Sequence, residues 1–193
     1  MSSKVRTRLI ESALNLFSQW GYEAVGVQQI VAMAKVTKPS LYHYFGSKRG
    51  LIEALFQETT QELLNELRLL EAAAVPSLPS VEPLVEAYFG FVRRNPAFYR
   101  LQLALYFAPL KSEGYKAAGK YYVIQREEVV RVLKNLLSGE EMSPVQLEWQ
   151  ATLLIGLINC CASAFLNGEI KLTAKVTEDT SDQFLFGTTS QNK

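Results

Sequence analysis

The chain has 193 residues, of which 48% are hydrophobic and 20% charged, the balance of a globular protein with one or two domains. This composition excludes a largely disordered chain, and no uninterrupted apolar run approaches the length of a membrane span. No secretory signal opens the chain, because charged residues occupy positions 4, 6, 8 and 11. The two cysteines are adjacent, so we expect no disulfide framework and a cytoplasmic location. Because no apolar run is long enough, we also expect no membrane partner.

The formal net charge of +1 conceals an uneven distribution along the chain. Residues 1–50 contain seven lysines or arginines and two glutamates, a net charge of +5, whereas residues 51–193 carry −4. A basic segment joined to a mildly acidic remainder indicates a nucleic-acid-binding end.

Apolar residues spaced by three or four positions predict helices along almost the whole chain. The first helix is expected to end at Trp20, because Gly21 suits a left-handed stop. Prolines mark a loop over residues 72–80, and Ser143-Pro144-Val145-Gln146 is a capping box. The remaining helices are predicted over residues 27–34, 38–45, from 48 through 67, 80–94, 96–108, 112–137 ending at Ser138-Gly139, 144–167, and part of 169–186, before a frayed end.

We therefore predict an all-α fold of about nine helices. Three short N-terminal helices form a DNA-binding domain over residues 1–47, and a helical bundle over 48–193 provides ligand binding and dimerisation. The N-terminal signature itself extends to about residue 64.

A helix, a tight turn and a second helix over residues 27–45 form a helix-turn-helix pattern. The second helix of such a unit lies in the major groove with its N-terminal residues facing base edges. Leu41 and Phe45 are expected to point inward, and Tyr42 lies between the two faces. Lys48 can add its charge to helix N-terminal amides that favour a phosphate. The residues expected to be exposed on the second helix are Thr37, Lys38, Ser40, His43 and Tyr44.

The segment VTKPSLYHYFGSKRGL at residues 36–51 resembles the recognition-helix signature of the TetR family of bacterial transcription regulators. Ala13-x-x-Leu16-Phe17, Gly21-Tyr22 and Ile30-x-x-x-Ala34 resemble the rest of that family's N-terminal domain. The resemblance implies a homodimeric repressor that binds a palindromic operator in double-stranded DNA and releases it on binding a small molecule. It implies Tyr42 and Lys48 on phosphates, and it places near bases or the adjoining backbone Gln28, Thr37, Lys38, Pro39, Ser40 and His43.

The chain departs from the family pattern in two places. Lys35 stands at the sharp turn where the family usually has glycine, and a non-glycine residue with positive φ costs about 1 kcal/mol. The turn is therefore expected to be either strained or differently shaped. Val25-Gly26 replaces the Thr or Ser that often precedes the first helix of the motif, so a side-chain phosphate contact is lost. Arg6 and Arg8 are either a mobile basic arm or a solvated helix start.

Aromatic residues are concentrated in one stretch of the chain. Ten of the 21 lie between Tyr88 and Tyr122, and six of these ten are tyrosines. They form either a helical core or the lining of a pocket for a small hydrophobic or aromatic effector. The tyrosines are the argument for the pocket, because each hydroxyl buried in a core needs a hydrogen-bond partner. The candidates for the pocket are Phe89, Val92, Phe107, Tyr122 and Trp149.

The helix predicted over residues 144–167 is apolar nearly all round, so it must be buried on more than one side. It is either enclosed within one subunit or, as the resemblance implies, part of a four-helix dimer interface with the last helix. Cys160 and Cys161 are predicted to be small buried residues rather than a thiol sensor. The interface candidates are Thr152, Ile155, Gly156, Asn159 and Ser163.

Catalysis is not expected, because the sequence has one histidine and no nucleophile set, phosphate-binding loop or metal-ligand spacing. No metal or cofactor is predicted. The alternative to a ligand-controlled repressor is a DNA-binding dimer of the same fold without a small-molecule ligand, controlled by a protein partner or acting architecturally.

Overall fold

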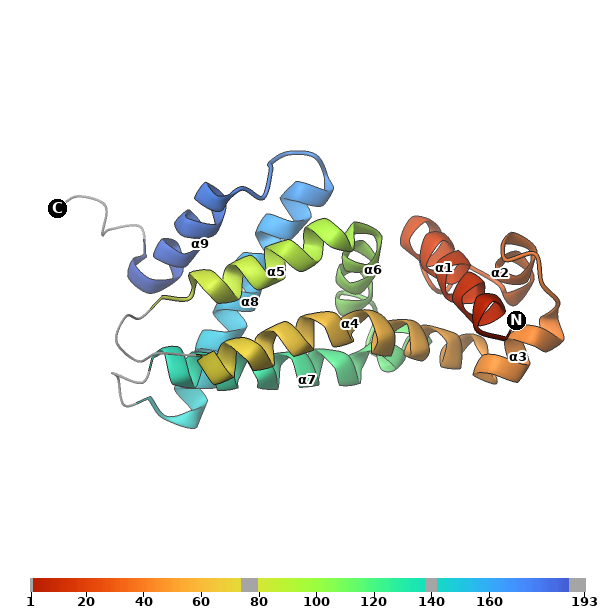
Figure 1. The fold of residues 1–193 in the computed structure, drawn as a ribbon, viewed down its shortest axis with the longest axis horizontal. Helices are drawn as coiled ribbons and strands as arrows, with labels where there is room; N and C mark the ends of the chain where they lie inside the picture. The colour runs from red at the N-terminus through yellow and green to blue at the C-terminus, as the bar shows by residue number, and fades with distance from the viewer. Residues whose placement is uncertain (1, 74–79, 138–141, 188–193) are drawn as a thin grey trace. The chain divides into compact units, whose positions relative to one another are not determined.

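The structure is a computed structural model that describes residues 2–73, 80–137 and 142–187 (Figure 1). The described residues form nine α-helices and no strand, which confirms the all-α prediction. Three predicted features lie outside the described residues: the loop around Pro76 and Pro79, the helix end at Ser138-Gly139 and the end at 188–193. The helices are α1 (Ser2–Trp20), α2 (Val27–Met33), α3 (Lys38–Phe45), α4 (Lys48–Ala73), α5 (Glu82–Arg94), α6 (Pro96–Tyr106), α7 (Glu113–Leu136), α8 (Pro144–Leu166) and α9 (Ala174–Phe186).

The helix ends follow the local chemistry of the sequence. Gly21 and Gly168 follow α1 and α8 closely with φ of 80° and 79°, a conformation that side chains disfavour. At the start of α8, Ser143 N donates to Gln146 Oε1 at 2.8 Å and Gln146 N donates to Ser143 Oγ at 3.3 Å. The predicted capping box is therefore confirmed.

The chain packs into two compact units, each built from two separate stretches. Unit 1 comprises Met1–Gln61 and Pro96–Tyr122, and unit 2 comprises Glu62–Asn95 and Val123–Lys193. Helix α4 begins at Lys48, directly after the predicted division at residues 47/48, and contributes residues to both units. Compactness thus divides the chain at positions other than the predicted functional boundary.

In unit 1, α1 packs against α2, α3 and α6. Leu9, Phe17 and Leu41 are fully or almost fully buried between these helices. Phe56 of α4 lies with its ring centroid 4.9 Å from that of Phe98 in α6, in an edge-to-face arrangement. Helix α6 is therefore part of the same core as the first three helices.

Two of the clustered tyrosines satisfy their hydroxyls within unit 1. Tyr121 Oη donates to the Glu53 carbonyl at 2.8 Å, and Tyr122 Oη donates to the Gln102 carbonyl at 2.9 Å. These hydroxyls thus have the partners that burial of a tyrosine requires.

In unit 2, α5 packs against α8 and α9, and α8 packs against α9. Glu128 is 3% exposed and accepts from Arg68 Nε at 3.0 Å, and its carboxylate lies 2.7 Å from Arg131. Thr177 of α9 donates to Glu86 Oε2 at 2.9 Å. Charged and polar contacts therefore complete the packing of this unit.

Helix α8 buries one side only within unit 2. The opposite side exposes Trp149 by 61% and Leu153 by 42%. By length and composition, α8 is also long and apolar enough to span a membrane, although the sequence was expected to lack such a run. Core helices of soluble proteins meet the same requirement. The buried side consists of Leu147, Ala151, Leu154, Ile158 and Ala162.

Candidate nucleic-acid interface

The helix predicted to lie in the major groove is α3, which is held on the core by one fully buried residue. Thr37 precedes the helix in an extended conformation, with φ −95° and ψ 157°, and Pro39 lies in the first turn, where proline is tolerated. Leu41 is 0% exposed and Phe45 is half-buried, as predicted for the inward side. This anchoring leaves the other side of α3 directed away from the core.

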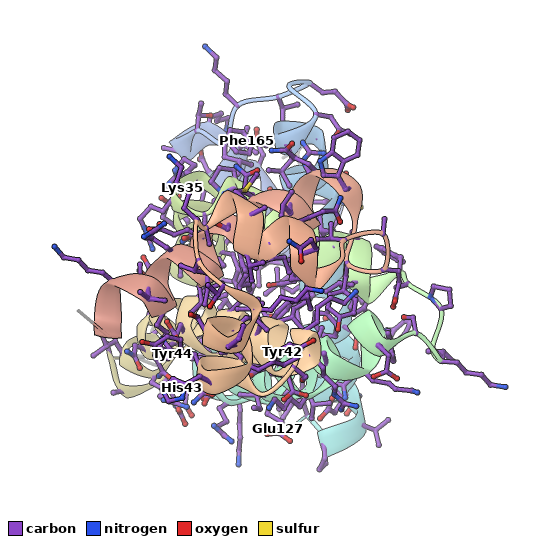
Figure 2. The ribbon with its side chains drawn as sticks, turned by 90° about the vertical axis from the view of Figure 1, so that its right-hand side faces the viewer. Lys35, Tyr42, His43, Tyr44, Glu127 and Phe165 are labelled. Atoms are coloured by element: carbon purple, nitrogen blue, oxygen red, sulfur yellow. The ribbon has the colours of Figure 1, made fainter. Side chains whose placement is uncertain are left out.

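Most of the predicted DNA-facing residues are exposed. Tyr42 is 50% exposed, and Ser40 is half-buried with its Oγ 3.0 Å from Thr37 Oγ1. Tyr44 was expected to be exposed but is half-buried, with its ring centroid 5.1 Å from that of His43 (Figure 2). The exposed members of the set are Gln28, Thr37, Lys38, Pro39, Tyr42 and His43.

Of the two alternatives for the turn between α2 and α3, the structure shows the strained one, with a left-handed Lys35. Lys35 has a φ of 51°, the only positive φ of a non-glycine residue among the described ranges. Val36 N donates to the Val31 carbonyl at 2.9 Å and Lys35 N donates to the Ala32 carbonyl at 3.1 Å. These two bonds form a Schellman motif, in which the left-handed position usually holds glycine.

Lys48 lies at the first position of α4 and supports the loop between α1 and α2. Its Nζ donates to the carbonyls of Tyr22 and Val25, both at 3.0 Å, and lies 4.1 Å from the centre of the Tyr22 ring. Desolvation on partial burial lowers the pKa of the Lys48 ammonium. An ammonium has three donors, so two act inside the protein and the phosphate role stays a prediction.

The other basic residues of this segment include arginines paired with carboxylates and exposed lysines. Arg6 pairs with Glu58 and lies over the Phe45 ring, so it is neither a mobile arm nor simply solvated. Arg49 lies 3.0 Å from Glu53 and 3.5 Å from Glu113. Lys35 and Lys38 are exposed around the turn and the start of α3. The charge available to a phosphate backbone is therefore smaller than +5.

The sequence leaves two interpretations of Arg8, a mobile basic arm or a solvated helix start. The structure places its guanidinium against the turn between α2 and α3. Its guanidinium donates to the carbonyl of Ala34 and, at 3.2 Å, to that of Lys35. The two partners lie 26 and 27 residues away in the sequence, so no local pattern reveals the contact.

Known proteins match the segment that carries this geometry. The sequence profile described as "Bacterial regulatory proteins, tetR family" matches residues 9–55, from α1 into α4. The chain belongs to the TetR family of bacterial regulatory proteins. Its TetR-family relatives are transcription regulators and not enzymes.

Two relatives and one solved structure show how far the likeness of this TetR-family chain extends. The transcriptional activator FasR of Mycolicibacterium smegmatis is 32% identical over 96 residues, 50% of this chain but only 44% of FasR. The uncharacterized HTH-type transcriptional regulator YdgC of Bacillus subtilis is 26% identical over 191 residues, 94% of this chain and 91% of YdgC. The regulator FadR of Bacillus subtilis, solved with stearoyl-CoA, shares the fold with a TM-score of 0.77 at 15% identity, over 94% of this chain and 98% of that chain.

The residues predicted to bind a ligand have different surroundings. Phe89 and Val92 of α5, in unit 2, are 0% exposed, whereas Tyr122 belongs to unit 1 and donates to the Gln102 carbonyl in that same unit. Phe107 is 78% exposed and Trp149 is 61% exposed, which does not suit residues enclosed around a ligand within one protomer. Phe89 and Val92 are the predicted residues whose burial suits an enclosed pocket.

The predicted interface stripe lies away from the core of unit 2. Thr152, Gly156 and Ser163 are exposed, and Ile155 and Asn159 are half-buried. Cys160 is exposed and Cys161 is half-buried, so the expectation that both are buried is wrong. The stripe belongs to the side of α8 that unit 2 leaves open.

Proposed function

We propose that this TetR-family regulator is a homodimeric repressor that binds a palindromic operator through α3 and releases it when a small apolar effector binds unit 2. The exposed N-terminal side of α3, held by the buried Leu41, is the observation that carries the proposal. Two such helices related by a two-fold axis enter successive major grooves about 34–36 Å apart.

Dimerisation through α8 is supported by its unpaired apolar side. Only 22% of the most apolar 18-residue stretch of α8 is buried in the protomer. Trp149 and Leu153 share this side with the small residues Gly156 and Ser163, which let another backbone approach. A second copy of α8 with α9 is the partner that we propose.

The effector proposal rests on the aromatic and apolar content of α5 and on the fold shared with FadR, which was solved with stearoyl-CoA. An acyl chain has the chemistry to enter between buried groups such as Phe89 and Val92. An effector can shift the DNA-binding equilibrium only by its differential affinity for the two forms, typically 1–3 kcal/mol.

Substitutions on α3 are expected to separate phosphate contacts from base contacts. The probe is the duplex that the intact protein selects from a random-sequence pool, measured by fluorescence anisotropy. Lys38→Ala should weaken binding to all duplexes similarly. It should reduce the slope of log affinity against log salt concentration by about 0.9 for each DNA-binding domain of the dimer. His43→Ala should reduce the preference for the selected duplex over point-substituted ones by about fivefold to tenfold. Wild-type binding and salt slope in both variants would exclude α3 as the reading helix.

A long-chain acyl-CoA is expected to stabilise the protein and to release DNA. Stearoyl-CoA should raise the melting temperature and weaken binding to the selected duplex, whereas coenzyme A without the acyl chain should do neither. Thermal unfolding and anisotropy titrations measure the two effects. Failure of a broad acyl-CoA and aromatic panel in both assays would favour the DNA-binding dimer without a small-molecule ligand.

A further inference from the structure

The turn of the helix-turn-helix has a strained residue at its centre. Lys35 occupies the left-handed position of the Schellman motif with a φ of 51°. Glycine adopts this conformation without strain, whereas a residue with a Cβ is disfavoured. Such a conformation persists only when surrounding contacts determine it.

Arg8 of α1 supplies such a contact. Its guanidinium donates to the carbonyls of Ala34 and Lys35, which belong to the peptide groups on either side of the Lys35 Cα. Carbonyl groups at a helix C-terminus lack helical partners, and a cation there satisfies them and the helix dipole together. Arg8 therefore joins α1 to the turn from which α3 departs.

We propose, on the basis of the DNA-binding function above, that Arg8 is a positioning residue for the recognition helix. It holds the turn at Lys35 in the left-handed conformation that glycine would adopt unaided. The orientation of α3 relative to α1 and α2 depends on this turn, because Leu41 is the only fully buried residue of α3. Arg8 acts on operator affinity through the protein rather than through DNA.

The first test is the operator affinity of Arg8→Ala over a range of salt concentrations. The probe is the duplex that the wild-type protein selects from a random pool. We expect binding about tenfold weaker, equivalent to 1.4 kcal/mol, with the salt slope unchanged. Removal of an arginine that bound a phosphate would instead lower the salt slope by about 0.9 for each DNA-binding domain of the dimer. An Arg8→Ala variant with wild-type affinity, or with a reduced slope, overturns the proposal.

The second test asks whether glycine at the turn makes Arg8 dispensable. In the Arg8→Ala background, Lys35→Gly should restore most of the lost affinity, whereas Lys35→Ala should not. The two substitutions remove the same charge and differ in the cost of a positive φ. Arg6→Ala is the matched control on α1, because its partners are Glu58 and the Phe45 ring and Lys35→Gly should not rescue it.

A structural readout separates positioning from general destabilisation. Hydrogen exchange of the Lys35 and Val36 amides, which close the Schellman motif, should be faster in Arg8→Ala and slower again after Lys35→Gly. Equal affinities of Lys35→Gly and Lys35→Ala in that background would refute the role of Arg8. If the wild-type protein binds no duplex, the DNA-binding function itself fails, which is a different result.

Discussion

Leu153→Glu is expected to separate the protein into monomers and to weaken operator binding by at least about a hundredfold. The side chain is 42% exposed on the open side of α8, where the proposed partner covers it. A carboxylate without a counter-charge is costly to bury in an apolar interface. Loss of the dimer also removes the advantage of two linked DNA-binding domains on one duplex, about 10²–10⁴ in affinity. Sedimentation velocity and anisotropy with the selected duplex measure the two effects.

Val123→Glu is the matched control, because Val123 is a 45% exposed apolar residue of α7 that receives the same charge. It should leave both the sedimentation coefficient and the affinity close to wild type. A Leu153→Glu variant that remains dimeric and binds the operator tightly would show that the open side of α8 is not the interface.

Gly114→Ala and Gly119→Ala are expected to change stability in opposite directions, although both lie in α7. A Cβ on Gly114 would lie 2.7 Å from Leu105 Cδ2 and 3.0 Å from Tyr22 Cδ1, so buried side chains must move. Overpacking of this kind costs about 1–3 kcal/mol. No neighbouring atom lies within 4 Å of the Cβ position at Gly119, so alanine should stabilise the helix there by about 0.5–1 kcal/mol. Thermal and denaturant unfolding measure the difference.

The same pair tests whether the α1–α2 loop supports DNA binding. Gly114 N donates to Glu23 Oε1 at 3.2 Å, and Lys48 holds the Tyr22 carbonyl of the same loop. A displaced Tyr22 should therefore weaken operator binding in Gly114→Ala but not in Gly119→Ala. Equal stability and equal affinity of the two variants would show that the close packing at Gly114 is unimportant.

Local chemistry made much of the fold predictable. Helix ends depend on residues close in sequence, such as Gly21 after α1 and the reciprocal bonds of Ser143 and Gln146 before α8. The strain at Lys35 was likewise expected, because a single residue had to adopt a glycine conformation. For these features the sequence neighbours supply nearly all of the determining interactions.

Contacts between distant segments were not predictable in the same way. Arg8 reaches the turn and Lys48 reaches the loop before α2 only after the helices have packed, so their partners have no signature in spacing. Helix rotation also decides which aromatics are enclosed: Phe89 is buried, whereas Phe107 is 78% exposed. Composition indicated an aromatic region but not which side of each helix the bundle covers.

Unit 1 has a consequence for the order of folding, because its two stretches are separated by residues 62–95. The core around Phe17 and Phe56 is complete only when α6 has joined it. We therefore expect the N-terminal helices to reach their final packing during synthesis only after residues 96–122 have left the ribosome. Closing the intervening loop has an entropic cost that grows slowly with its length, and such non-local closure slows folding. Although the N-terminal helices are made first, their packing would then depend on a segment synthesised much later.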